Sequence, residues 1–306
     1  MIVLFCCNPL DSKEVDFDYL GEYNAAKNQG FDVRLINFEE LVNNNNPIAA
    51  IRKIPMMSEP QIAVFRGWMM KPNKYEELYN VLLTKNIKLI NSPYAYKHCH
   101  YLPEAYELVR VCTPKTVWVS KETLNKDFES IHRVLQVFGE SPVIVKDYVK
   151  SRKHEWFEAC YIQNASDVDK VNNVVKKFIE LQGDDLNEGI VFREFINLEF
   201  LDNHIKSNMP LSKEFRVFFV DGEPAYLVNY WDEGEYGDIM PELKPFLNVA
   251  KKIQSKFFTM DIAKVENGGW IIMELGDGQV SGLPNCADLK CFFSNIKKSI
   301  EGMLKS

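Results

Sequence analysis

Apolar runs of strand length alternate with helical patterns through the first hundred residues. Four such runs lie at residues 2–7, 31–38, 61–67 and 87–93. Segments of helical periodicity lie between them at residues 16–29 and 75–85, and Gly30 ends the first of these. Strands that alternate with helices are typical of a parallel sheet with helical crossovers. The N-terminal part is therefore predicted to be an α/β domain built on a parallel sheet.

The pattern changes at Thr113-Pro114, and we place a domain boundary there, between residues 1–113 and 114–306. Beyond it, helices are predicted at residues 128–138, 168–182 and 287–304. Strands are predicted at residues 113–120, 142–149, 156–162, 189–196, 214–220, 224–231, 257–265 and 270–277. Asp221-Gly222 and Asn267-Gly268 are typical of hairpin turns. The second domain is therefore predicted to be α+β.

The composition excludes several classes of protein. The chain has 306 residues, of which 46% are hydrophobic and 26% charged, as in ordinary globular proteins. Its net charge of −7 argues against a nucleic-acid partner. No apolar run approaches the roughly 20 residues that span a bilayer, and the start lacks the basic segment of a signal peptide. We therefore expect a protein without membrane contact.

The cysteines indicate a compartment. Seven cysteines are scattered along the chain, an odd number that favours reduced thiols in a cytoplasmic protein. The run His98-Cys99-His100 has the residue types of a zinc site. No second cluster follows at ligand spacing, so we do not expect zinc there.

Single charged residues interrupt the apolar strands of the second domain, namely Lys146, Arg216, Asp261 and Glu274. A charge in a buried strand is costly unless it is paired or binds a ligand. One such residue is commonly an outward-facing charge, but four of both signs indicate a site. Carboxylates on neighbouring strands can hold Mg²⁺, and a lysine with an arginine can neutralise nucleotide phosphates.

The order of these motifs resembles the ATP-grasp fold. The chain shows PVIVKDYVKS, REFINLE, KEFRVFFVDGEPA and TMDIAKVENGGWIIMELGDGQ in the order that this family uses. FRGW at residues 65–68, NSPYAYKHCHYLP, and TP before a strand resemble the branch named for its two arginines and a lysine. The resemblance implies a Rossmann-like pre-ATP-grasp domain at 1–113. It also implies an ATP-grasp domain at 114–306, with the nucleotide in a cleft between two sheets.

The resemblance also implies roles for residues that bind ATP. Lys146 and Lys97 would contact the phosphates, although Lys97 could equally be a solvated lysine at the start of a helix. Glu194 would meet the adenine amino group, and the backbone of Phe195 and Ile196 the edge of the ring. Val145 and Met273 would line the adenine pocket, and Glu199 would hold the ribose hydroxyls unless it is only an exposed carboxylate.

For the chemistry, the resemblance implies that Asp261 and Glu274 bind Mg²⁺ and that Arg216 stabilises charge on the transferred phosphoryl group, with Lys146 also catalytic. The third metal position of the family is usually Asn but is Gly276 here. We expect Asp277 or water to fill it.

The loop after Lys146 departs from the family, because it is basic and has no glycine. Its cations could hold phosphate electrostatically and close over the nucleotide as a lid, or the loop could be a solvated turn. They are Lys150, Arg152, Lys153 and His154. Arg66 in FRGW could serve substrate or structure, and Arg193 substrate or only solvent.

The resemblance implies an ATP-dependent ligase that joins a small-molecule or peptide carboxylate to an amine through an acyl phosphate, with Mg²⁺. Three alternatives remain open: a kinase that stops at phosphoryl transfer, an inactive nucleotide-binding module, and an enzyme that modifies nucleic-acid ends. Relatives are often dimers, so a homodimer is expected by analogy.

Overall fold

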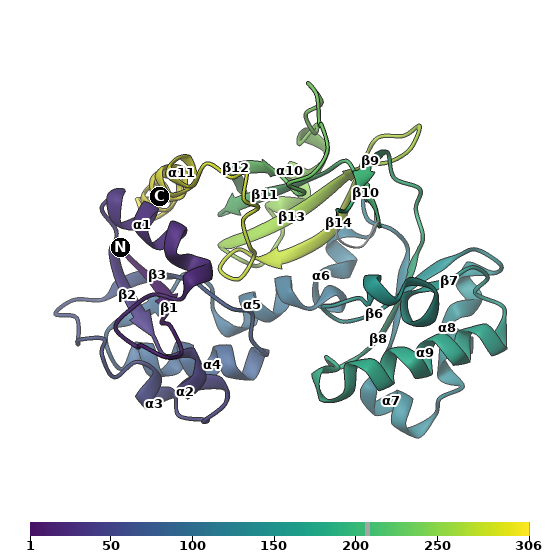
Figure 1. The fold of residues 1–306 in the computed structure, drawn as a ribbon, viewed down its shortest axis with the longest axis horizontal. Coiled ribbons are helices and arrows are strands. Elements are labelled where there is room, and N and C mark those ends of the chain that lie inside the picture. Colours follow the sequence, from purple (N-terminus) through teal and green to yellow (C-terminus); the bar gives the residue numbers. More distant parts are fainter. Residues whose placement is uncertain (206–208, 306) are drawn as a thin grey trace.

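The computed structural model describes residues 1–205 and 209–305. Its N-terminal sheet is parallel, with strand order β2-β1-β3-β4 (Figure 1). The strands are β1 (Ile2–Cys6), β2 (Asp32–Ile36), β3 (Gln61–Arg66) and β4 (Ile87–Leu89). The helices are α1 (Leu20–Asn28), α2 (Phe38–Val42), α3 (Pro47–Ala50), α4 (Pro72–Leu83), α5 (Pro93–His100) and α6 (Leu102–Val109).

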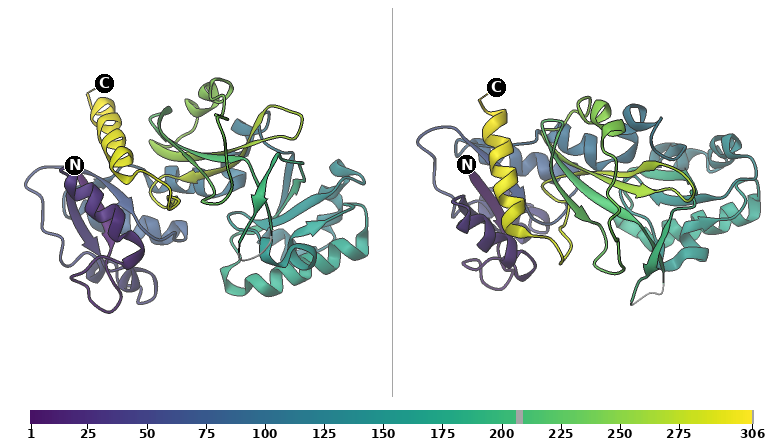
Figure 2. Two further views of the ribbon diagram at one scale, coloured as in Figure 1. Left: turned by 45° about the horizontal axis from the view of Figure 1, so that its top comes forward. Right: turned by 90° about the horizontal axis from the view of Figure 1, so that it is seen from above.

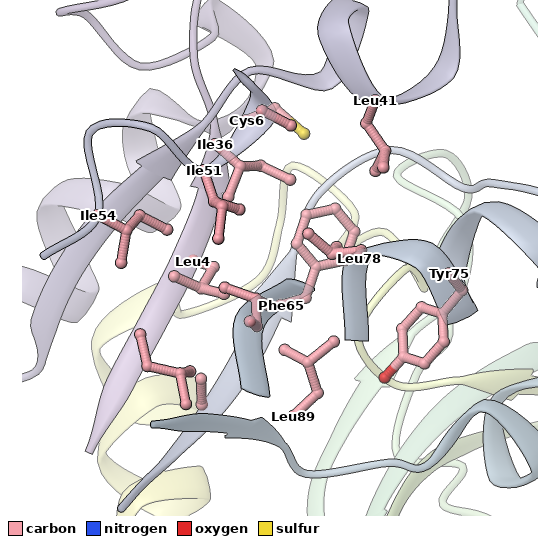
Figure 3. Packing of buried hydrophobic residues seen from close by; sticks show 14 of the residues in the cluster. Leu4, Cys6, Ile36, Leu41, Ile51, Ile54, Phe65, Tyr75, Leu78 and Leu89 are labelled. Atoms are coloured by element: carbon pink, nitrogen blue, oxygen red, sulfur yellow. The ribbon is translucent and has the colours of Figure 1, made fainter. Parts of the chain in front are cut away.

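One face of this sheet forms the first hydrophobic core. Leu4 and Phe65 from β1 and β3 pack with Leu78 from α4 and with Leu41 from α2 (Figure 3). Each of these side chains is fully buried. The continuous apolar runs of the parallel strands are explained by this packing, because both faces of the sheet are covered.

A second, smaller sheet is antiparallel, with strand order β5-β8-β6-β7. Its strands are β5 (Thr116–Ser120), β6 (Val143–Asp147), β7 (Tyr161–Ile162) and β8 (Gly189–Glu194). The helices α7 (Lys121–Lys126), α8 (Ser130–Leu135) and α9 (Val168–Gln182) lie against one of its faces. Alternation along β6 therefore leaves Lys146 on the opposite face, because Val143 and Val145 are in the helix-covered core.

The large sheet is also antiparallel, with strand order β12-β11-β13-β14. Its strands are β11 (Glu214–Val220), β12 (Glu223–Asn229), β13 (Phe257–Lys264) and β14 (Trp270–Asp277). A two-stranded sheet of β9 (Phe200–Asn203) and β10 (Pro210–Ser212) lies in the chain between the small sheet and the large sheet. The remaining helices are α10 (Lys244–Ala250) and α11 (Leu289–Met303).

The large sheet lies between the N-terminal domain and the small sheet (Figure 1). Phe218 and Phe257 of the large sheet pack into a shared hydrophobic core with Phe5 of β1 and Phe293 of α11. The C-terminal helix α11 thus returns to the N-terminal domain and lies beside α1 (Figure 2). The division into 1–113 and 114–306 stays a prediction, because this core includes residues from both parts.

The predicted fold class is confirmed: a parallel N-terminal sheet is followed by antiparallel sheets. The turn Asp221-Gly222 has positive φ at both residues, 52° and 79°, as a tight hairpin requires. The strand predicted at 156–162 is wrong over most of its length, because residues Trp156–Cys160 form a wide helical turn. No helix in the described part of the chain is long and apolar enough to cross a membrane.

Candidate active site

Three charged residues form a row across the large sheet. Arg216 pairs with Asp261 in the register of β11 and β13, and Asp261 pairs with Glu274 in the register of β13 and β14. Directly paired residues of an antiparallel sheet share a face, so the three side chains point to the same side. Arg216 donates from Nε and Nη2 to the two oxygens of Asp261, each at 2.8 Å. The structure thus brings these three charges to one face of one sheet.

Lys146 joins this row from the other sheet. Its Nζ lies 2.7 Å from Oε1 of Glu274, so one ion pair links β6 of the small sheet to β14 of the large sheet. The Lys146 side chain is 9% exposed, whereas the Glu274 side chain is 42% exposed. Val145, expected to line the adenine pocket, is instead in the helix-covered core, and Ile144 shares the face of Lys146.

Ion pairs offset burial for two charges of the row, whereas burial and the Glu274 charge keep the pKa of the third, Asp261, above its usual value despite Arg216. Burial would lower the pKa of the Arg216 guanidinium, but the charge and hydrogen bonds of Asp261 raise it above its usual range. Burial would likewise raise the pKa of the Glu274 carboxyl, but the nearby Lys146 ammonium brings it below its usual value. Arg216 and Glu274 are therefore ionised at neutral pH, each held in its charged form by an oppositely charged neighbour.

Glu214 belongs to the same face but was missed by the sequence reasoning. It lies two residues before Arg216 on β11 and is 8% exposed. Among residues 1–205 and 209–305, its carboxylate makes no hydrogen bond and no ion pair. Burial raises the pKa of Glu214 to about 7, an effect that the charge of Lys153 partly opposes. A buried carboxylate without a partner retains its capacity to accept hydrogen bonds from a ligand.

The basic loop after β6 begins with a tight turn. The buried carboxylate of Asp147 accepts hydrogen bonds from the backbone of Val149 and Lys150, and from Gln182 and Asn187. The Lys150 side chain is exposed at this turn. Further along, Lys153 is exposed and its charge acts on Glu214, Asp261 and Glu274. Arg152 pairs with Glu155, so it is held within the loop itself.

The predicted adenine contacts lie at the end of β8. The Phe195 amide donates to the carbonyl of Pro142 at 3.0 Å, which continues the sheet. Of the Phe195 backbone, the carbonyl is therefore the group that remains for a ligand, and its contact with adenine stays a prediction. The Glu194 carboxylate accepts from the Lys115 amide at 3.4 Å, and Ile196 follows in the chain toward the large sheet.

Two further predicted ATP contacts are paired within the protein. The Glu199 carboxylate lies 2.6 Å from Nζ of Lys213. Lys97 lies in the last turn of α5 rather than at a helix start, and its Nζ is 2.9 Å from Glu104. Both side chains are partly exposed. Their contacts to ribose and phosphate stay predictions.

The expectation for Asp277 is wrong. Asp277 is three residues beyond Glu274 on β14 and lies on the opposite face, where it is fully buried. Its carboxylate accepts hydrogen bonds from Asn91 and Gln279. Asp277 therefore ties the large sheet to the N-terminal domain and cannot complete a metal site.

Gly276 cannot be replaced by a larger ligand without movement. A Cβ at this position would lie 2.7 Å from the hydroxyl oxygens of both Ser281 and Thr259. These two hydroxyls are 2.9 Å apart and fill the space beside Gly276. The absence of a side chain at the third metal position is thus built into the packing.

Arg66 and Arg193 prove to be buried structural groups. Arg66 is 1% exposed, donates to both oxygens of Glu22, and donates to the carbonyls of Gly278 and Ser281. Arg193 is 7% exposed, and its guanidinium contacts the backbone of β14. The structural alternative for Arg66, a pairing with a nearby acid, is therefore the one that the structure shows, whereas the expected solvent exposure of Arg193 is wrong.

The donors of the row fit Mg²⁺. Asp261 and Glu274 supply carboxylate oxygens from neighbouring strands, and Glu274 uses one oxygen on Lys146 while its side chain is partly exposed. Mg²⁺ is usually held by one or two carboxylates together with phosphates and water. Within the described residues, no group of three or more metal-ligating side chains forms a complete cage. The pair therefore suits a metal that arrives with a nucleotide.

The fold is shared with solved ATP-grasp structures. The ligase PsnB complexed with precursor peptide PsnA2 and AMPPNP is 12% identical, with 97% of this chain and 96% of that chain covered and a TM-score of 0.56. D-alanine–D-alanine ligase from Bacillus anthracis complexed with ATP is 14% identical, with 99% and 98% covered and a TM-score of 0.59. D-cycloserine synthetase DcsG is 11% identical, with 97% and 99% covered and a TM-score of 0.59.

At the level of sequence, no curated protein matches the chain. A family model does match: residues 136–296 fit the ATP-grasp domain of family 3 in the clade named for two arginines and a lysine. The matched segment is more than half of the chain, and it contains Lys146, Arg216, Asp261 and Glu274. The protein therefore belongs to the ATP-grasp family, in the clade named for two arginines and a lysine.

Proposed function

We propose that the protein is an ATP-dependent ligase that joins a carboxylate to an amine. One observation carries the proposal: the row Arg216–Asp261–Glu274 on the large sheet meets Lys146 from the small sheet across a 2.7 Å ion pair. Family membership and the shared fold support the same conclusion. The convergence provides two cations for phosphates and two carboxylates for a metal.

ATP would lie between the small and large sheets. Lys146 would contact the phosphates, with Lys97, Lys150 and Lys153 contributing charge from α5 and from the loop. Of these cations, Lys146 and Lys153 already act on the Glu274 carboxylate and lower its pKa. A triphosphate that binds here would therefore replace Glu274 as the partner of Lys146.

The nucleoside would lie toward the end of β8. Glu194, the Phe195 carbonyl and the Ile196 backbone would meet adenine. Glu199 would accept from the ribose hydroxyls, with Glu214 as a second acceptor nearby. Glu214 has the greater spare capacity, because Glu199 is paired with Lys213 at 2.6 Å.

Asp261 and Glu274 would hold Mg²⁺, which when bound neutralises charge on the phosphate oxygens. Arg216 supports the same task from the protein side. It uses three of its five N–H donors on Asp261 and on the Gly282 carbonyl, so two remain for a phosphoryl oxygen. Positioning and charge stabilisation are the main contributions expected of such a site.

In the first step, an oxygen of the substrate carboxylate attacks the γ-phosphorus, and the bond from that phosphorus to the bridging oxygen of ADP breaks. ADP leaves with the electron pair, and an acyl phosphate remains. The amine nitrogen then attacks the acyl carbon, the carbon–oxygen bond to phosphate breaks, and phosphate leaves. The surplus proton on nitrogen passes to phosphate or solvent. We expect small-molecule or peptide substrates.

The test is ADP release with panels of carboxylates and amines, with amide formation followed by mass spectrometry. Lys146→Ala is expected to lose nucleotide binding and Glu274→Ala to lose turnover. A phosphorylated product without amide would identify a kinase. ATP binding without any ADP release would favour an inactive nucleotide-binding module. Turnover that persists in both variants would contradict the proposed site.

A further inference from the structure

Strand β14 contains an irregularity directly before Glu274. Asp261 of β13 pairs with Glu274, but the next residue, Ile262, pairs with Ile272. Met273 is therefore an extra residue in β14, a β-bulge. A bulge bends its strand and redirects the neighbouring side chain, and bulges are frequent next to active sites. The direction of the Glu274 carboxylate thus depends on how this bulge is held.

Arg193 holds the bulge. Its Nη1 donates to the carbonyl of Met273, and its Nη2 donates to the carbonyl of Ile272 at 3.2 Å. Nη2 also donates to the hydroxyl of Thr113 at 2.5 Å, and that hydroxyl donates to the Ile272 carbonyl at 2.8 Å. Strand β8 and the segment before β5 are thereby joined to β14 at one point.

Arg193 is placed for this task at a physical cost. It is 7% exposed, and among residues 1–205 and 209–305 its guanidinium has no carboxylate in ion-pair contact. Burial lowers the pKa of Arg193 to about 10, so it still carries its charge at neutral pH. Arg66, by comparison, is buried against both oxygens of Glu22. A buried cation that bonds to carbonyls and not to a carboxylate costs stability. Such a cost is expected where the cation holds another group in place.

The location of Arg193 links it to the site. Arg193 pairs with Ile144 and Val191 pairs with Lys146 in the register of β6 and β8, so Arg193 and Lys146 share a face. The Arg193 charge also lowers the pKa of Glu274. Arg193 is thus the point where the small sheet holds the strand segment that carries Glu274.

We propose that Arg193 is a positioning residue: it clamps the bulge at Met273 to β8 and so sets the direction of the Glu274 carboxylate. The inference rests on the proposed function, because it assigns Glu274 to the metal. It implies that the metal-dependent part of nucleotide binding requires Arg193, although Arg193 itself need not contact nucleotide or metal.

The test measures ADP affinity by calorimetry in Mg²⁺ and in EDTA. The quantity compared between variants is the dissociation constant in EDTA divided by the dissociation constant in Mg²⁺. Arg193→Met is expected to lower this ratio about tenfold, as loss of groups that orient metal ligands commonly does. Its affinity in EDTA is expected to stay within about twofold, because the phosphate-binding lysines are intact. A general loss of stability would not change the ratio, since each variant is its own reference.

Two further variants refine the test. Arg193→Lys keeps the charge but loses the two-pronged contact, so an intermediate ratio is expected. Thr113→Val keeps the volume and removes the hydroxyl, so a smaller decrease is expected. Arg133→Met is the matched control, because Arg133 is exposed and pairs only with Asp127 among the described residues. Its ratio should equal that of the wild type.

An unchanged ratio in Arg193→Met, or in Thr113→Val if Arg193→Met does not fold, would overturn the inference. A decrease of the same size in Arg133→Met would overturn it as well. If the wild type binds no ADP in either condition, the proposed function fails and this inference fails with it. Wild-type binding with Mg²⁺ dependence, together with an unchanged variant, would leave the proposed function intact and remove only the role of Arg193.

Discussion

Two groups of charged residues lie at the junctions between the sheets of this protein, and they differ in how completely their hydrogen-bonding capacity is used within the protein. At the junction of the N-terminal sheet and the large sheet, Arg66 donates to both oxygens of Glu22 and to two backbone carbonyls. Beside it, Asp277 accepts from Asn91 and Gln279. This junction network is closed in its hydrogen bonds, which come from groups of the protein itself, although burial raises the pKa of Asp277 to about 7.

The cleft row, formed by Lys146, Glu274, Arg216 and Asp261, is not closed. The Glu274 side chain gives one oxygen to Lys146 and is 42% exposed. Glu214 next to the row is buried and has no hydrogen-bond or ion-pair partner among the described residues. The comparison teaches that a charge in an apolar strand does not by itself identify a site. Remaining hydrogen-bonding and charge capacity distinguishes a ligand site from a structural network.

The largest effect is expected from the open group. Glu274→Gln keeps the shape of the side chain and removes the charge that pairs with Lys146 and would bind the metal. We expect the rate of ADP release to fall by about 10³-fold or more, as for loss of a group that stabilises developing charge. The free energy of unfolding should fall by less than when a fully buried ion pair is broken, because water reaches Lys146 beside the partly exposed side chain of residue 274. A large loss of stability with activity retained would reverse the comparison.

The closed group should behave in the opposite way. Arg66→Met leaves the Glu22 carboxylate buried without its partner, so the free energy of unfolding should fall by about 3 kcal/mol. The turnover of the folded fraction should remain within a few-fold of the wild type. Urea unfolding and ADP release at a temperature below the transition measure both quantities. The double variant Arg66→Met/Glu22→Gln should recover part of the lost stability.

The strands that carry the site could be predicted from the sequence because their signals are local. Each apolar run is interrupted by one charge, and the thirteen-residue interval from Asp261 to Glu274 fits two strands and a turn. Strand alternation also places Asp277 on the face opposite Glu274, so that expectation was wrong for a reason visible in the sequence. The segment 156–162 failed differently: its apolar pattern fits a strand, but Trp156–Cys160 coil into a helical turn.

Other features depend on contacts that are distant in the sequence. Glu214 follows Lys213 at the start of a strand and reads as half of a solvated charge pair, yet the fold buries it. The role of Arg193 depends on a bulge in a strand 80 residues away. Alternation alone cannot show that the opposing surface is another sheet and not solvent. Such residues become visible only when both partners are placed.

Glu214 allows a pH test of the open group. Burial raises its pKa in the folded protein from 4.5 to about 7, with the charges of Lys153, Asp261, Arg216 and Glu274 facing it. The folded state then binds the proton more tightly than the unfolded state, so the stability linked to this proton is present below about pH 4.5 and is lost as the pH rises to 7. Glu214→Gln removes this loss.

We therefore expect Glu214→Gln to stabilise the nucleotide-free protein by about 2 kcal/mol more at pH 8 than at pH 5. Urea unfolding at the two pH values measures the difference. An equal effect at both pH values would mean that burial does not raise the pKa of Glu214. The same variant should weaken discrimination between ATP and its 2′-deoxy or 3′-deoxy analogues if Glu214 meets the ribose.

The smallest effect is expected from Lys153 in the loop. Its charge acts on Glu214, Asp261 and Glu274 from across the cleft, so it can neutralise a triphosphate that enters there. Lys153→Gln should raise the KM for ATP about fivefold, near 1 kcal/mol, and leave kcat nearly unchanged. Because the contact is exposed, the effect should shrink at high salt.

Lys177→Gln is the matched control for the loop lysine, since Lys177 is exposed on α9 and pairs with Glu180 at 3.0 Å. Its KM should equal that of the wild type at every salt concentration. If the two variants behave alike, the loop does not cover the phosphates. The charge of the triphosphate must then be neutralised by Lys146 and Arg216 alone. If only Lys153→Gln raises the KM for ATP, and this rise disappears at high salt, then Lys153 of the loop is a further cation that binds the triphosphate.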